Sequence, residues 1–153
     1  MQKILTITIP SYNVEAYIAA TLDTMVTINN LDLLEILVVN DGSKDNTVVV
    51  AQQYVNKYPN SVRIIDKENG GHGSTINAGI REATGKYFKV VDGDDWVDSV
   101  ALQNLLDFLK DHDADLIINP CTKCLWMTTN AKSYWLSYRL KQNMVRLFHM
   151  KMH

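Results

Sequence analysis

The sequence predicts an α/β fold in which a mainly parallel β-sheet is covered by helices on both faces. Short apolar runs, each the length of a strand, alternate along residues 1–119 with segments whose apolar side chains recur at helical spacing. The runs are apolar at consecutive positions, which indicates strands that are buried on both faces. Polar, glycine-rich or acidic loops follow the runs, and ligands of such sheets bind beyond the carboxyl ends of the strands. We therefore expect the functional residues at that edge.

The first strand is expected at residues 4–9, a short β-branched run that Pro10 ends. Apolar residues then recur at helical spacing over residues 14–25, and Asn13 is a suitable N-cap for that helix. Residues 35–40 form a second apolar run without alternation, so they predict a second buried strand.

The next helix is expected to begin after Asp45 or Asn46, either of which can cap it, and to end at Pro59. Residues 62–65 predict the third strand. A glycine-rich loop at residues 69–73 then leads into a third helix.

That third helix is expected around residues 76–83, and residues 86–91 predict the fourth strand. A fourth helix follows, because leucines recur at i, i+3, i+4 and i+7 at Leu102, Leu105, Leu106 and Leu109. Residues 115–118 predict a fifth strand.

The composition is that of one globular domain, with 153 residues of which 46% are apolar and 21% are charged. A net charge of −2 argues against a general nucleic-acid binder. No apolar segment approaches the roughly 20 residues of a membrane span, and the opening lacks a signal-peptide layout. We therefore expect a cytoplasmic protein, in which Cys121 and Cys124 are incidental thiols.

The charge changes abruptly along the chain. Residues 1–115 carry all seventeen acidic residues and nine basic ones, whereas residues 116–153 carry six basic residues and no acidic one. We therefore divide the chain into a domain at residues 1–119 and an atypical basic tail at residues 120–153.

Two interpretations of this tail stay open. In the first, it forms a basic amphipathic helix that lies on the anionic inner face of the membrane. The apolar face of that helix would consist of Leu136, Leu140, Met144, Leu147 and Phe148. In the second, which we favour, the tail is translated out of frame after about residue 122. The bases that encode residues 126–128 also encode two aspartates in another frame.

Three carboxylates, those of Asp92, Asp94 and Asp95, lie within four residues directly after the fourth strand. Like charges this close repel one another unless a cation or hydrogen-bond donors offset them. Such a group can supply oxygen ligands to a hard divalent cation, which in turn can hold a diphosphate. The alternative is an acidic turn in which Asp98 or Ser99 caps the following helix.

The loops after the other strands suit a nucleoside diphosphate. Tyr12 can stack on a base, and Asp41 can accept hydrogen bonds from a base N–H or a ribose hydroxyl. Lys67 begins a flexible, donor-rich loop in which His72 can touch a phosphate. Each residue also has a purely structural interpretation, as a packed loop residue or a turn.

Two common nucleotide-binding motifs are missing. The turn after the first strand contains no glycine, so the dinucleotide fingerprint is absent. The glycines at positions 70, 71 and 73 are not followed by the Gly-Lys-Ser/Thr of a P-loop. A nicotinamide dehydrogenase and a P-loop kinase are therefore both disfavoured.

Five motifs, in order and at compatible spacing, together resemble glycosyltransferase family 2, whose members have the GT-A fold. They are Ile-Pro-Ser-Tyr-Asn at 9–13, Leu-Val-Val-Asn-Asp-Gly-Ser-Lys-Asp-Asn-Thr at 37–47, Asn-Gly-Gly at 69–71, Asn-Ala-Gly-Ile at 77–80 and Val-Asp-Gly-Asp-Asp at 91–95. The resemblance covers roughly residues 3–119.

The resemblance implies transfer of a sugar, with inversion, from a nucleotide donor that is usually a UDP-sugar. It implies that Pro10, Tyr12, Asp41 and Lys67 belong to the nucleotide site. Asp92-Gly93-Asp94 matches the family's Asp-x-Asp motif, with Asp92 near the ribose and Asp94 on Mg²⁺ or Mn²⁺. Asp95 is expected to assist at the metal.

The general base expected in this family cannot be assigned, because no acidic residue follows Asp115. We therefore expect the donor-binding part of an enzyme that acts on a saccharide or lipid-linked acceptor in polysaccharide or glycolipid assembly. The exposed surface of such a part could associate with a second copy. One alternative is a nucleotide-sugar-binding module without turnover. The other is a nucleotidyltransferase, which would normally carry a glycine-rich basic loop after the first strand.

Overall fold

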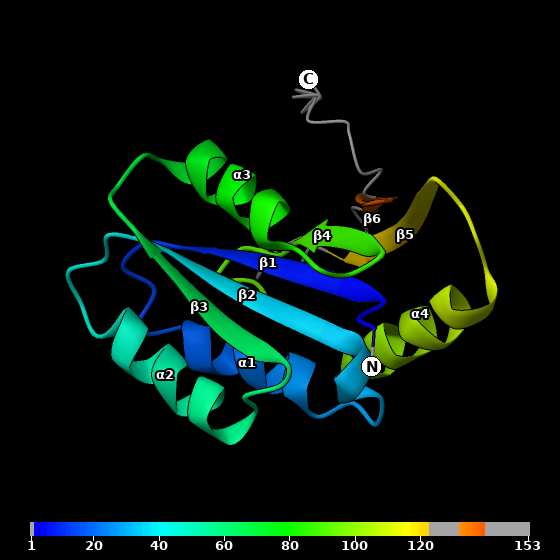
Figure 1. Ribbon diagram of the computed structural model, residues 1–153, viewed down its shortest axis with the longest axis horizontal. Helices are drawn as coiled ribbons and strands as arrows, with labels where there is room; N and C mark the ends of the chain where they lie inside the picture. The colour runs from blue at the N-terminus through cyan, green and yellow to red at the C-terminus, as the bar shows by residue number, and fades with distance from the viewer. Residues whose placement is uncertain (1, 123–131, 140–153) are drawn as a thin grey trace.

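The computed structural model describes residues 2–122 and 132–139. Within them lies one six-stranded sheet of order β3-β2-β1-β4-β6-β5 (Figure 1). The strands are β1 (Leu5–Ser11), β2 (Leu34–Asp41), β3 (Val62–Lys67), β4 (Tyr87–Val90), β5 (Leu116–Thr122) and β6 (Lys132–Arg139). The helices are α1 (Ile18–Val26), η1 (a 3-10 turn, Leu31–Leu33), α2 (Thr47–Lys57), α3 (His72–Glu82) and α4 (Ser99–Asp111).

The first four strands are parallel, which confirms the predicted α/β fold. β1 lies at their centre and pairs with β2 on one side and β4 on the other. β3 extends the sheet beyond β2. No helix among the described residues has the length and apolar character needed to cross a membrane.

Side chains alternate along each strand, so each face of the sheet has its own apolar cluster. The two clusters differ in size. Leu5, Ile7 and Ile9 of β1 are fully buried in a large core with α1, α2 and α4. The opposite face carries a smaller apolar cluster, in which Leu37 and Val39 of β2 meet Ala78 of α3. Of the helices that the structure describes, α3 is the one on that face (Figure 1).

α3 lies unusually close to β1 because Gly79 has no side chain. A Cβ built on Gly79 would lie 2.3 Å from Oγ1 of Thr8 and 2.4 Å from its Cγ2. Thr8 is buried, and its hydroxyl oxygen has no hydrogen-bond partner. The short contact fixes the position of α3 and therefore of the loop at its N-terminus.

The predicted helix in the tail is wrong where the structure describes it. Leu136 and Arg139 lie in β6, which pairs antiparallel with both β4 and β5. Residues 132–139 hold three aromatic residues, which favour a strand. The helical period therefore does not apply to this part of the tail. Cys121 lies in β5, whereas Cys124 and the rest of the proposed helix and frameshift segment lie outside the described residues.

Two predicted boundaries near the first strand are also wrong. β1 continues through Pro10 to Ser11, since its pairing with β4 stops at Thr8 and a proline is tolerated where one side is unpaired. Asn13 does not cap a helix, because α1 begins only at Ile18 and Asn13 takes a left-handed φ of 53°. Of the other predicted caps, Asn46 precedes α2 but makes no side-chain capping hydrogen bond, whereas Asp98 and Asp45 accept from backbone N–H groups at the start of a helix. The Asp98 carboxylate accepts from the Ala101 N–H at 2.9 Å, and Asp45 Oδ1 accepts from the Thr47 N–H at 3.0 Å.

A buried carboxylate, that of Glu35, joins β2 to its neighbours at the amino ends of the strands. It accepts hydrogen bonds from the Thr6 hydroxyl (2.7 Å), the Thr84 N–H (2.8 Å) and Arg63 Nη2 (3.0 Å). Burial alone would raise the pKa of Glu35, but these three donors outweigh it and hold that pKa below the usual value.

Candidate functional site

A cleft of about 500 Å³ opens at the carboxyl ends of β1, β2 and β4. The chain leaves β1 towards β2 and β3 on one side and returns to β4 on the other, so the cleft lies where the strand order reverses. It is lined by Pro10, Ser11, Tyr12, Val14, Asp41, Asn69, Gly71, His72, Thr75, Asp92, Gly93 and Asp94.

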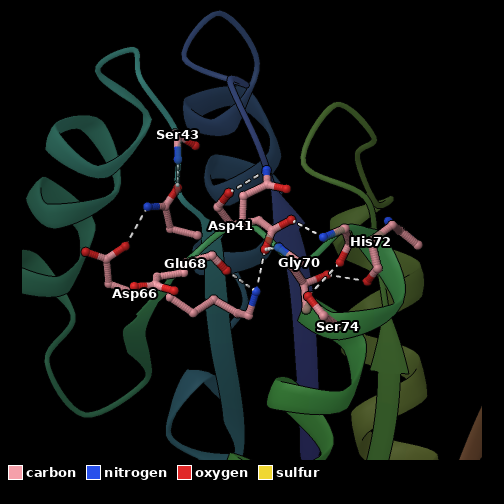
Figure 2. Close-up of polar contacts among 12 residues, drawn as sticks. Asp41, Ser43, Asp66, Glu68, Gly70, His72 and Ser74 are labelled. Atoms are coloured by element: carbon pink, nitrogen blue, oxygen red, sulfur yellow. Dashed lines mark hydrogen bonds and ion pairs between the residues drawn. The ribbon is translucent and has the colours of Figure 1, made fainter.

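Asp41, the last residue of β2, is the most constrained carboxylate of the cleft. Its side chain is 4% exposed. Oδ1 accepts from Lys67 Nζ and from the Gly70 N–H (2.9 Å), and Oδ2 accepts from the Gly71 N–H (2.8 Å). Figure 2 shows Asp41 among these donors. Burial favours a higher pKa for Asp41, but the three donors reverse that effect and lower the pKa, so the carboxylate is ionised at neutral pH.

The loop after β3 is shaped to place those donors. The Asn69 side-chain amide donates to the Asp41 carbonyl at 2.9 Å, which ties the loop to the end of β2. Gly42 has a φ of 71°, and a Cβ there would lie 3.2 Å from the Asn69 nitrogen. Gly71 has a φ of 82°, which turns the chain into α3. The positive φ angles therefore favour glycine both after Asp41, at Gly42, and at the start of α3, at Gly71.

The loops after β1 and β2 are joined by a set of hydrogen bonds that we call the loop clamp. Asn40 supports it by accepting from the Ser43 N–H at 3.1 Å. The clamp consists of Asn13 N to Ser43 Oγ (3.0 Å), Lys44 N to Asn13 Oδ1 (2.8 Å), Val14 N to Thr47 Oγ1 (2.9 Å), Glu15 N to Asp45 Oδ2 (3.0 Å) and Asn46 N to Glu15 Oε2 (2.9 Å). It holds Tyr12 at the rim of the cleft with 48% of its surface exposed.

The acidic loop after β4 is held by α1. The Thr21 hydroxyl donates to the Asp95 carbonyl at 2.6 Å and lies 3.0 Å from the Gly93 carbonyl. A Cβ on Gly93 would lie 3.1 Å from the Pro10 carbonyl oxygen, so a small residue lets the loop approach β1 closely. Asp92 and Asp94 consequently face the cleft, whereas Asp95 does not line it.

Asp92 is partly buried and lies within reach of the charge of Asp94. Burial, and to a lesser extent the charge of Asp94, raise the pKa of Asp92, although His72 opposes them. The His72 ring nitrogen Nε2 lies 3.8 Å from Asp92 Oδ1. Bringing a cation between the two carboxylates would relieve their repulsion.

Within the described part of the chain, no three His, Cys, Asp or Glu side chains come together as a complete metal site. Mg²⁺ and Mn²⁺ do not require one, because such ions are often held by one or two carboxylates together with water and the phosphates of a substrate. Asp92 and Asp94 fit that arrangement.

Six of the eight predicted site residues line this cleft: Pro10, Tyr12, Asp41, Asp92, Gly93 and Asp94. Lys67 does not line the cleft but donates a hydrogen bond to Asp41, which does. Asp95 does not line the cleft, so its predicted place at the metal is not supported. The sequence interpretation missed Val14 and Thr75, which also line it. Thr75 is buried and donates to the His72 carbonyl at 2.6 Å, and nothing in a helical segment distinguishes such a threonine beforehand.

Comparison with known proteins gives consistent matches. A family model described as glycosyl transferase family 2 matches residues 6–152. The minor teichoic acid biosynthesis protein GgaB of Bacillus subtilis is 32% identical over 110 residues, which cover 71% of this chain and 12% of that protein.

Two solved structures share the fold and were determined with nucleotide sugars. Staphylococcus aureus TarS 1–349 in complex with UDP-GlcNAc superposes with a TM-score of 0.67 and 28% identity, covering 74% of this chain and 33% of that one. The mannosyltransferase PcManGT of Pyrobaculum calidifontis, in complex with GDP-Man and Mn²⁺, gives a TM-score of 0.64 and 25% identity, covering 76% and 35%. The chain therefore spans about a third or less of each of these relatives.

Proposed function

Because this chain belongs to glycosyl transferase family 2, we propose that its cleft binds a UDP-sugar together with Mg²⁺ or Mn²⁺. The observation that carries the proposal is the convergence of Tyr12, Asp41 and the Asp92–Asp94 pair on one cleft at the strand-order switch point. The complex of TarS with UDP-GlcNAc supports the choice of nucleotide.

Each part of the cleft suits one part of the donor. Tyr12 would stack on the base, and the ionised Asp41 would accept an N–H of the base. Asp92 would contact the ribose, and Asp94 would hold the metal with help from Asp92. When bound, the ion would neutralise charge that develops on the departing diphosphate. His72 would lie near the phosphates.

The reaction we propose for the whole protein is transfer of the sugar, with inversion, to a hydroxyl of a saccharide or lipid-linked acceptor. Family membership makes this reaction more plausible than nucleotidyl transfer. A cytoplasmic location, contact with the inner face of the membrane and self-association remain predictions.

The test is a calorimetric titration of this chain with UDP in Mn²⁺ and, separately, in a chelator. We expect binding only with Mn²⁺, and its loss in Asp94→Asn. Asp107→Asn is the matched control, because Asp107 lies on the exposed face of α4 and outside the cleft. Unchanged UDP affinity in Asp94→Asn would show that this carboxylate does not hold the metal.

A transfer assay with UDP-sugars separates an enzyme from a binding module. UDP binding with turnover supports the transferase, and UDP binding without turnover supports the module. If UDP does not bind to the folded chain, the proposal fails.

A further inference from the structure

The contacts of Lys67 limit what Asp41 can bind. An ionised carboxylate offers about four acceptor positions, two on each oxygen. Lys67 Nζ and the Gly70 amide occupy both positions on Oδ1, and the Gly71 amide occupies one on Oδ2. Among the contacts of residues 2–122 and 132–139, one position, on Oδ2, is left for a ligand. Since Asp41 lines the cleft, that position is the one a base could reach.

The loop is built around the ammonium group of Lys67. The Lys67 side chain is 22% exposed, so it is held in place and largely shielded from solvent. Lys67 Nζ donates a second hydrogen bond, to the Glu68 carbonyl. A Cβ on Gly70 would lie 3.1 Å from Nζ and 2.7 Å from Ser74 Oγ, so a larger residue there would crowd the ammonium group. Lys67 therefore occupies a specific place on Asp41 Oδ1.

Nucleobases differ in how many N–H groups they present to a carboxylate. Uracil presents one such group, N3–H, which lies between two carbonyl oxygens. These oxygens would be repelled by a second carboxylate oxygen that has no donor of its own. Guanine presents two adjacent donors, N1–H and the 2-amino group, which pair best with both oxygens of a carboxylate. A carboxylate with a single open acceptor suits uracil, and it leaves one guanine donor without a partner, which costs binding free energy.

We propose that Lys67 is a specificity-determining residue that selects uracil over guanine by occupying Oδ1 of Asp41. The inference rests on the proposed function, because it assumes that the base contacts Asp41. Lys67 acts through Asp41 and needs no contact of its own with the nucleotide. Replacing it with methionine opens an acceptor on Oδ1 and leaves the two glycine amides in place.

The experiment measures dissociation constants of UDP and GDP by calorimetry in Mn²⁺, for the unmodified chain, Lys67→Met and Lys67→Gln. We expect the unmodified chain to bind UDP at least tenfold more tightly than GDP. In Lys67→Met that ratio should fall roughly tenfold or more, about the value of one hydrogen bond to a charged group. Lys67→Gln keeps an N–H donor, on a side chain one bond shorter than that of lysine, and should retain more of the preference than Lys67→Met does.

Lys110→Met is the matched control, since Lys110 also pairs with an aspartate but lies on α4, away from the cleft. It should leave the ratio unchanged. An unchanged ratio in a folded Lys67→Met, or equal UDP and GDP affinity in the unmodified chain, would overturn the inference while leaving the proposed function in place. If Lys67→Met does not fold, the Lys67→Gln ratio tests the role of Lys67, and equal UDP and GDP affinity in the unmodified chain still overturns the inference. Failure of both nucleotides to bind would instead reject the proposed function.

Discussion

Removing the Glu35 carboxylate should destabilise the fold by about 3–4 kcal/mol. In Glu35→Ala, the buried Thr6 hydroxyl and the partly buried Thr84 N–H lose their acceptor, and each donor left without one costs roughly 1–3 kcal/mol. Arg63 adds little, because its side chain is 44% exposed and its charge is screened by water.

Urea unfolding followed by circular dichroism gives the free energy of unfolding for both chains. Glu82→Ala is the control, since Glu82 lies 4.0 Å from Arg63, is 54% exposed and should cost less than about 0.5 kcal/mol. A loss below about 1 kcal/mol in Glu35→Ala would refute the reasoning.

The sign of the pH dependence follows from the lowered pKa of Glu35. The folded state holds this group ionised at a lower pH than the unfolded state does, so its contribution is complete above the usual glutamate pKa of 4.5. It is lost as the pH falls through the lower pKa of the folded state. The difference in stability between Glu35→Gln and the unmodified chain should therefore shrink below pH 4.5. A constant difference down to the acid transition would contradict the assignment.

Two further changes test the packing of α3 and the rim of the cleft. Gly79→Ala should cost about 1–3 kcal/mol in urea unfolding, because its Cβ would overlap Thr8, and Thr8→Ala in the same chain should recover part of that loss. Full additivity of the two changes would contradict direct contact. Tyr12→Ala should weaken UDP binding by roughly 1–3 kcal/mol in calorimetry, as expected for a lost base stack, with unchanged thermal stability. Tyr17→Ala, at a residue that is exposed but outside the cleft, should leave affinity unchanged, and an equal loss there would argue against stacking.

Most of the parallel sheet could be predicted because its strands are apolar on both faces, as in residues 35–40, and their order along the chain is simple. Parallel strands also bring their carboxyl ends to one edge, so placing Asp41 and Asp92 in one cleft required no knowledge of side-chain positions. The roles of these residues in nucleotide binding follow from the family resemblance.

What could not be predicted depends on contacts between distant segments. Asn13 looks like a helix cap, but its side chain is bound by the Lys44 N–H, 31 residues away, and the helix starts later. Lys67 is predicted to belong to the nucleotide site, but its ion pair with Asp41 depends on the pairing of β2 with β3, which the local sequence does not show. The place of β6 between β4 and β5 is a long-range pairing that local spacing cannot reveal.

The loop clamp has a consequence for how a ligand is received. Its backbone donors are already engaged before any nucleotide arrives, so the rim that carries Tyr12 does not have to become ordered during association. Little conformational entropy is then lost on that side of the cleft. Capture of the base should accordingly proceed in a single kinetic step, without a slow rearrangement of this rim.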